Sequence, residues 1–122
     1  RRTMNPLAAY KENAVTTQSK GKMVVLLYDG AIRFLKQALG SIQEGDVARR
    51  NELIQKAEAI IDELDFSLNM EAGGELAENL RRLYDFMRRH LIAGNIHNDG
   101  QRIQEVISIL AELSSGWRAI AG

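Results

Sequence analysis

The stretch that decides the fold is MVVLLYDGAIRFLKQAL, residues Met23 to Leu39. It contains no proline, and its length and spacing predict a helix. Wheel plotting at 100° per residue spreads its apolar side chains over an arc of about 200°, with Leu26 on the far side. A bundle helix needs only about three positions in seven to face a core. The stretch therefore predicts a core helix with surplus apolar surface that something else must cover.

The rest of the chain reads as further helices separated by a few turn signals. No alternation typical of strands persists anywhere. Glycine favours the left-handed backbone that ends a helix, and aspartate caps the start of the next one. The turn signals are Gly45-Asp46, Gly73-Gly74 and Asn98-Asp99-Gly100. They predict four helices at about residues 20–44, 47–71, 75–97 and 100–120, with Asp46 and Asp99 as caps. Short turns between long helices favour an all-α, antiparallel up-down four-helix bundle.

The N-terminal segment predicts a short extra helix ahead of this bundle. The one proline, Pro6, is tolerated in a first helical turn, so a helix is expected from Pro6 to Val15. The polar segment Thr16 to Gly21 predicts a hinge. The length of 122 residues predicts one domain, with residues 1–17 as the N-terminal segment and 18–122 as the bundle.

Three features suggest a groove for a partner. The first is the wide apolar arc of the opening stretch, and the others are two apolar pairs off the core stripes, Phe66/Met70 and Ile92/Ile96. Any one of them alone is ordinary protein surface. Together they favour a partner groove. Its cover is expected to be the N-terminal helix, through Leu7, Tyr10 and Val15, another chain, or each in turn.

Composition excludes several classes of function. The 16 basic and 16 acidic residues cancel, so neither nucleic acid nor a membrane surface is an expected partner. Residues 1–61 carry +4 and residues 62–122 carry −4, an imbalance that favours an unevenly charged surface over a docking face. There are no cysteines, which suits a reducing compartment. The longest apolar run, Met23 to Tyr28, is too short to span a bilayer.

No catalytic or metal-binding pattern stands out. The di-iron bundles need Glu-x-x-His on two helices, but Met87 and Gly94 precede His90 and His97 by three residues. The two histidines, about 10 Å apart along one helix, are too distant to share an ion without other ligands. There is no phosphate-binding loop or nucleophile elbow. The sequence predicts a protein that is not an enzyme and has no cofactor.

Several motifs in order resemble the flagellar export chaperone family FliS. Residues 5–17, NPLAAYKENAVTT, are similar to the start of that family, and residues 27–32, LYDGAI, resemble its most recognisable motif. Further similar positions are Ala57, Ile60, Ile61, Glu63-Leu64, Ser67-Leu68, Gly73-Gly74, Asn79-Leu80, Leu83-Tyr84, Asn95, Asp99 and Trp117. The chain departs from the family at residues 18–20, Gln-Ser-Lys in place of Ala-Ser-Pro, and in a less basic C-terminal end.

The resemblance implies a non-enzymatic chaperone of the bacterial cytosol with an antiparallel helix-bundle fold. Such a protein binds the disordered C-terminal segment of flagellin, prevents premature polymerisation and delivers flagellin to the flagellar type III export gate. An export-gate component is then a second expected partner, and a monomer or weak dimer the expected state. The alternative is a self-associating helical-bundle adaptor that binds another amphipathic helix.

Resemblance and apolar surplus together suggest residues for partner binding. Leu7 and Tyr10 are expected to cover the groove until flagellin displaces them. The first helix offers Leu27, Tyr28 and Phe34, although Tyr28 is better explained as a core residue whose hydroxyl reaches a partner. The others are Leu83, the apolar anchors Ile92 and Ile96, and Asn79 and Asn95, which either bond to ligand backbone or are solvated or capping residues.

Overall fold

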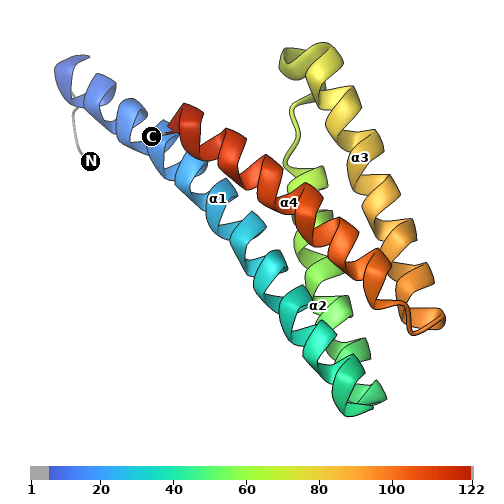
Figure 1. The fold of residues 1–122 in the computed structure, drawn as a ribbon. Coiled ribbons are helices and arrows are strands. Elements are labelled where there is room, and N and C mark those ends of the chain that lie inside the picture. The colour runs from blue at the N-terminus through green and yellow to red at the C-terminus, as the bar shows by residue number, and fades with distance from the viewer. Residues whose placement is uncertain (1–5, 122) are drawn as a thin grey trace.

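The predicted all-α architecture is confirmed. The structure, a computed structural model, describes the backbone of residues 6–121 and the side chains of residues 21–70 and 72–120. The chain forms four helices, α1 (Pro6–Glu44), α2 (Val47–Phe66), α3 (Met70–Ile96) and α4 (Gly100–Ala121), shown in Figure 1. None of these helices is both long enough and apolar enough to cross a membrane.

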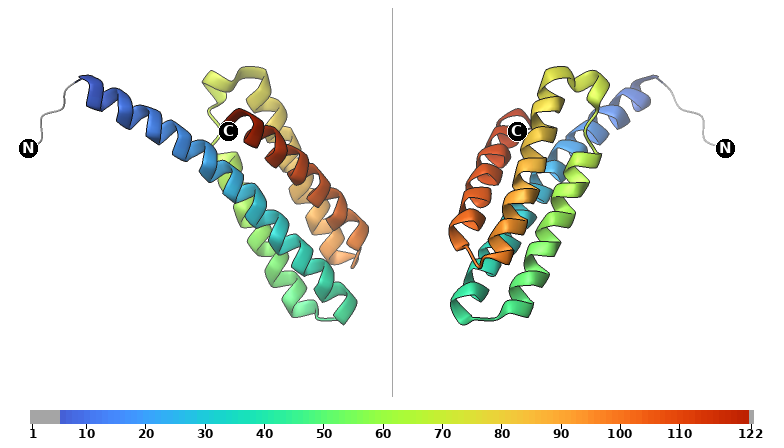
Figure 2. Two further views of the ribbon diagram at one scale, coloured as in Figure 1. Left: turned by 60° about the vertical axis from the view of Figure 1, so that its left-hand side comes forward. Right: turned by 90° about the vertical axis from the view of Figure 1, so that its right-hand side faces the viewer.

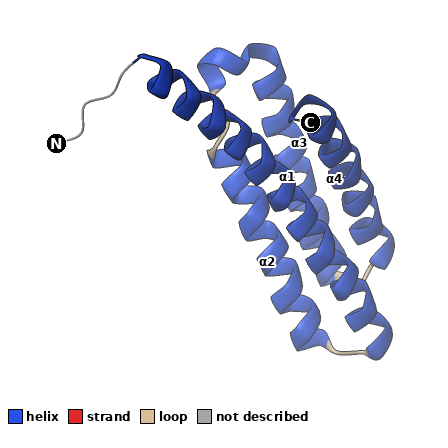
Figure 3. Ribbon diagram, turned by 90° about the vertical axis from the view of Figure 1, so that its left-hand side faces the viewer, coloured by secondary structure: helices blue, strands red, loops and turns tan. Residues whose placement is uncertain are grey.

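The helices form an antiparallel bundle in which α1 lies diagonally across from α3. Helix α1 packs against α2 and α4, and α3 closes the bundle by packing against the same two helices (Figure 3). The short turns between consecutive helices impose this up-down order. The parts of the four helices near residues 24, 66, 76 and 117 therefore lie together at one end of the bundle, which we call the open end.

The predicted hinge after a separate N-terminal helix is wrong. Helix α1 runs without a break from Pro6 to Glu44, through Thr16 to Gly21. The only strong helix breaker here, Pro6, occupies the first helical position, where its missing N–H costs nothing. A single glycine costs only about 1 kcal/mol in a helix, so Gly21 is not enough to end it.

In the continuous α1 the N-terminal segment extends the helix, and the expectation that Leu7 and Tyr10 cover part of the groove stays a prediction. The 39 residues of α1 extend about 58 Å at 1.5 Å per residue, roughly twice the length of α2. The first turns of α1 consequently run past the open end and away from the other helices (Figure 2). The side chains of Leu7, Tyr10 and Val15 lie outside the described residues.

Two of the three turns form as the sequence predicts. Gly45 has a positive φ of 73°, and the Asp46 side chain accepts a hydrogen bond from the Arg49 N–H at 3.0 Å. At the turn before α4, Asn98 has a positive φ of 53°, and the Asp99 side chain accepts from the Gln101 N–H at 3.0 Å. Each aspartate satisfies one of the free N–H groups at a helix start.

We expect the substitution Asp46→Ala to lower the free energy of unfolding by about 1 kcal/mol, the usual contribution of an N-cap side chain. Urea unfolding followed by circular dichroism measures the change. Asp46→Asn is the matched control, because the amide oxygen still accepts the same bond and should retain most of the stability. Equal losses for the two variants would contradict the capping role.

The connection between α2 and α3 differs from the prediction. Helix α2 ends at Phe66 rather than near residue 71, and α3 begins at Met70 after Asn69, whose side chain accepts from the Ala72 N–H at 3.0 Å. Gly74 then interrupts the helical backbone with φ 53° and ψ −127°. The glycine pair therefore marks a break, as predicted, but one that lies inside α3, one turn after its start.

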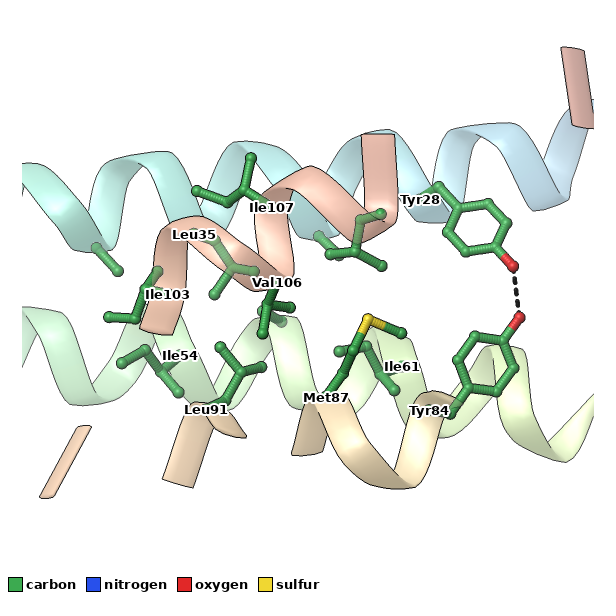
Figure 4. Close-up of a cluster of buried hydrophobic side chains, with 14 of the residues drawn as sticks. Tyr28, Leu35, Ile54, Ile61, Tyr84, Met87, Leu91, Ile103, Val106 and Ile107 are labelled. Carbon is green, nitrogen blue, oxygen red and sulfur yellow. Dashed lines mark hydrogen bonds between the residues drawn. The ribbon is translucent and has the colours of Figure 1, made fainter. Parts of the chain in front are cut away.

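The core runs along the bundle axis, with side chains from all four helices (Figure 4). Tyr28, Leu35, Ile61, Met87 and Leu91 are fully or almost fully buried within it. Their spacing of three, four or seven residues within a helix places them on one face. The opening stretch, residues 23–39, thus contributes core residues from end to end, as its pattern predicts.

Candidate functional site

An apolar pocket occupies the open end of the bundle. Its volume is about 360 Å³, enough for a few apolar side chains of a ligand. All four helices and the α2–α3 connection line it. The lining residues are Val24, Leu64, Ser67, Leu68, Asn69, Ala72, Gly73, Leu76, Ala77, Leu80, Tyr84 and Trp117.

The connection after α2 forms one wall of the pocket. Ser67 ends α2 by donating from its hydroxyl to the Leu64 carbonyl at 2.8 Å. Asn69 then starts α3, and Gly74 turns the backbone before the long part of that helix begins. Ala72 and Gly73, two small residues, line the pocket beside this connection.

Two tyrosines meet inside the bundle next to this pocket. The hydroxyl oxygens of Tyr28 on α1 and Tyr84 on α3 lie 2.5 Å apart, joined across the core (Figure 4). Burial raises the pKa of both phenols above the ordinary value, and the mutual hydrogen bond raises the pKa of Tyr84 further. Both phenols therefore remain protonated donors at neutral pH. The prediction that Tyr28 is a core residue with a partnered hydroxyl is confirmed.

A polar cluster fixes the end of α4 beside the pocket. The Asp29 carboxylate on α1 accepts a hydrogen bond from the Ser114 hydroxyl at 2.8 Å and a second bond from the Arg118 guanidinium. Ser114 is buried, whereas the Arg118 side chain is mostly exposed. Trp117, which lies between them in sequence, lines the pocket. The Asp29 cluster thus holds the α4 wall of the pocket against α1.

We expect Asp29→Ala to lower the free energy of unfolding by about 1–2 kcal/mol, because it leaves the buried Ser114 hydroxyl without its acceptor. Arg118→Ala removes only an exposed ion pair and should cost less than about 0.5 kcal/mol. Chemical denaturation of both variants makes the comparison. A larger loss for Arg118→Ala than for Asp29→Ala would show that the ion pair, not the buried bond, fixes α4.

Exposed apolar side chains gather at the same end. Of the nine large apolar side chains that are exposed within residues 21–120, five belong to the parts of the helices near the open end. Phe66 is 91% exposed and Leu76 is 65% exposed, although both are large enough to favour burial strongly. These five are Met23, Leu26, Phe66, Leu76 and Ile120. An apolar pocket surrounded by exposed apolar side chains is typical of a protein-binding site.

The predicted partner-binding residues that the structure describes lie at several places on the bundle. Leu27 and Leu83 are partly buried and pack against the core. Phe34 is also partly buried, and the Lys56 ammonium lies 5.5 Å from its ring centre. Ile92 and Ile96 are exposed near the opposite end of α3 from the pocket. Among the predicted residues whose side chains the structure describes, none lines the pocket.

The two asparagines have different surroundings. Asn79 is exposed, and its side-chain oxygen accepts from the Arg82 guanidinium at 2.7 Å. Both polar atoms of the Asn95 amide form hydrogen bonds. Its oxygen accepts from the Arg50 guanidinium at 2.8 Å, and its nitrogen donates to the Asn51 side-chain oxygen at 2.8 Å. Asn95 therefore ties the end of α3 to the start of α2, and we do not propose it as a ligand contact.

No pocket residue was predicted from the sequence to bind a partner. Leu76 and Trp117 belong to apolar stripes that predict core positions, yet Leu76 is exposed and Trp117 only half-buried. Asn69 and Ala72 belong to no motif. The glycine pair at residues 73–74 was a usable signal, because it marks the break that separates the connection from the long part of α3.

Comparisons with known proteins agree with the bundle and with the motifs. The family model described as flagellar protein FliS matches residues 3–122. The chain is 40% identical over 111 residues to the flagellar secretion chaperone FliS of Salmonella typhimurium, covering 90% of this chain and 82% of that protein. It is 36% identical over 114 residues to the Bacillus subtilis protein of the same name, covering 93% and 84%. The Vibrio cholerae chaperone FliS is 40% identical over 118 residues, covering 93% and 87%.

The match spans nearly the whole chain, including the stretch that forms α1 and all the residues that line the pocket. The three relatives, from different bacteria, are all flagellar secretion chaperones. The chain belongs to the FliS family of flagellar secretion chaperones.

Proposed function

We propose that this protein binds the C-terminal segment of flagellin in the bacterial cytosol, prevents its premature polymerisation and delivers it to the flagellar type III export apparatus. The proposal needs no catalytic step and no cofactor. The observation that supports the proposal is the pocket at the open end. A chaperone for an unfolded export substrate needs an apolar surface that is accessible before the substrate arrives, and this pocket is open and lined by all four helices.

The geometry suits a segment that becomes helical when it binds. An amphipathic helix presents apolar side chains at positions i, i+3, i+4 and i+7 to a groove. The pocket of about 360 Å³ takes the side chains of about one helical turn. The exposed side chains around it, Met23, Leu26, Phe66, Leu76 and Ile120, offer further apolar contact to the flanking turns. Ile92 and Ile96, farther along α3, offer a second apolar contact to a segment that continues along the bundle.

Reversibility also fits an export chaperone. A disordered segment that orders on binding loses conformational entropy, which reduces the affinity per unit of buried area. The substrate is then held firmly enough to block polymerisation but is released when the export apparatus engages it. An export-gate component is the second partner in this proposal.

Calorimetric titration tests the proposal. The titrant is a peptide of about 40–50 residues from the C-terminus of a cognate flagellin, long enough for two helices of bundle length. An N-terminal peptide of the same flagellin and of equal length is the control. We expect the C-terminal peptide to bind with a clearly negative heat-capacity change and a gain of helicity. Equal binding of both peptides, or of neither, would contradict the proposal.

A further inference from the structure

The hydroxyls of Tyr28 and Tyr84 have more protons to donate than acceptors to receive them. Each phenol carries one O–H donor and an oxygen that accepts. Only one proton can lie between the two oxygens, which are 2.5 Å apart. Either hydroxyl can be the donor in this bond, but the other then has a proton that needs a different acceptor. Among the described residues, no other acceptor is bonded to either hydroxyl.

A third polar group nearby, the Trp117 indole, supplies no acceptor for the remaining proton. The Trp117 indole lies close enough to the Tyr28 hydroxyl to lower the pKa of Tyr28, opposing the larger effect of burial. An indole has only an N–H donor and cannot accept. Three donors thus meet around two phenolic oxygens, and one proton is left over. Deprotonation does not solve this, because burial holds both phenols in the neutral form.

The pocket gives access to this group. Tyr84 and Trp117 both line the pocket, whereas Tyr28 is fully buried behind them. In the free protein, solvent entering the open pocket can accept the remaining proton. A ligand that displaces this solvent with hydrocarbon alone would leave a buried donor unsatisfied, which is unfavourable. The ligand therefore has to bring an acceptor of its own.

We propose that the segment bound in this pocket carries a neutral carbonyl oxygen among its apolar groups, and that Tyr84 donates a hydrogen bond to that oxygen. In the complex, Tyr28 donates to Tyr84, and Tyr84 donates to a side-chain carboxamide or a free main-chain carbonyl of the ligand. A neutral acceptor is preferred to a carboxylate, because the pocket is mostly apolar and a charge would lose its hydration there. The inference rests on the proposed function for the identity of the ligand, but it concerns how this pocket selects among apolar segments.

Two tyrosine variants separate this role from a structural one. Tyr84→Phe and Tyr28→Phe both remove the same hydrogen bond across the core, so both should lose similar stability. Only Tyr84→Phe removes the donor that faces the ligand. Against the C-terminal flagellin peptide in calorimetry, we expect Tyr84→Phe to bind roughly tenfold more weakly than the wild type, as for the loss of one hydrogen bond. Tyr28→Phe should bind within about twofold of the wild type, because Tyr84 still donates.

A small probe makes the test independent of flagellin. Cyclohexanone presents one neutral carbonyl on an apolar ring, and its entry should change the fluorescence of Trp117, the single tryptophan of the chain. We expect binding to the wild type and to Tyr28→Phe, and weaker binding to Tyr84→Phe. If the ketone shows this order but the peptide does not bind, the proposed function fails and the acceptor site stands. Equal affinities of the two variants for the ketone, or no binding to the wild type, would overturn the inference.

Discussion

Replacing Ala72 with tryptophan is expected to weaken binding of the C-terminal flagellin peptide by at least about 100-fold, or about 2.8 kcal/mol. Ala72 lines the pocket yet is exposed, so a larger side chain there can enter the pocket without displacing the core. An indole is large enough to fill much of a space of about 360 Å³. The apolar side chains of the ligand could then no longer enter the pocket. The complex would lose the binding free energy that comes from burying them.

Ala111→Trp is the matched control for this substitution. Ala111 is exposed on α4 and does not line the pocket. Both variants should unfold within about 0.5 kcal/mol of the wild type, as surface substitutions usually do. Calorimetry with the same peptide then compares the affinities. Unchanged affinity in Ala72→Trp, or an equal loss in both variants, would show that the ligand binds elsewhere on the bundle.

The second large effect is on stability. Leu91→Ala should lower the free energy of unfolding by about 3 kcal/mol, within the range measured for truncating buried leucines. Leu91 is fully buried between helices, and its loss leaves a cavity that close-packed neighbours fill only in part. Urea denaturation at constant temperature measures the shift in midpoint, provided that the slope is unchanged.

The neighbouring residue supplies the control. Ile92 is similar in size, follows Leu91 on the same helix and is 48% exposed. Ile92→Ala should cost less than about 1 kcal/mol, since most of its surface remains in contact with water. Similar losses for the two variants would mean that Leu91 is not part of a close-packed core.

The sequence predicts the bundle well because its signals are local. Helical spacing alone places Tyr28, Leu35 and Leu91 on buried faces. Gly45 and Asp46 mark a turn through backbone and capping chemistry that needs no tertiary partner. Such features depend on residues within one helical turn of each other, so they can be recognised in the sequence before the fold is known.

The predictions that fail depend on weaker or longer-range effects. The polar segment Thr16 to Gly21 suggested a hinge, but helical propensities differ by only a few tenths of a kcal/mol for most residues, and α1 continues through it. The end of α2 at Phe66 depends on how Ser67 and Asn69 bond to nearby backbone. These small, competing free-energy contributions determine where helices end. The pattern of apolar residues gives no information about them.

The pocket could not be predicted because its walls come from distant parts of the chain. Val24 and Trp117 are separated by most of the sequence, and the connection around Asn69 completes the wall only after α3 has packed. Apolar periodicity treats Leu76 and Trp117 as ordinary core positions. The same pattern describes a residue in a filled core and one beside an open pocket, and only the packing of neighbouring helices distinguishes the two.

The most direct test of the account uses Trp117 as its reporter. Trp117 lines the pocket and is the single tryptophan of the chain, so a flagellin C-terminal peptide without tryptophan leaves its fluorescence unambiguous. The measurement is the quenching of Trp117 fluorescence by acrylamide, with and without a saturating amount of peptide. The account predicts strong protection from the quencher and a shift of the emission to shorter wavelength when the peptide binds. Calorimetrically confirmed binding with unchanged quenching and emission would contradict it, because the ligand would then occupy a surface other than the open end.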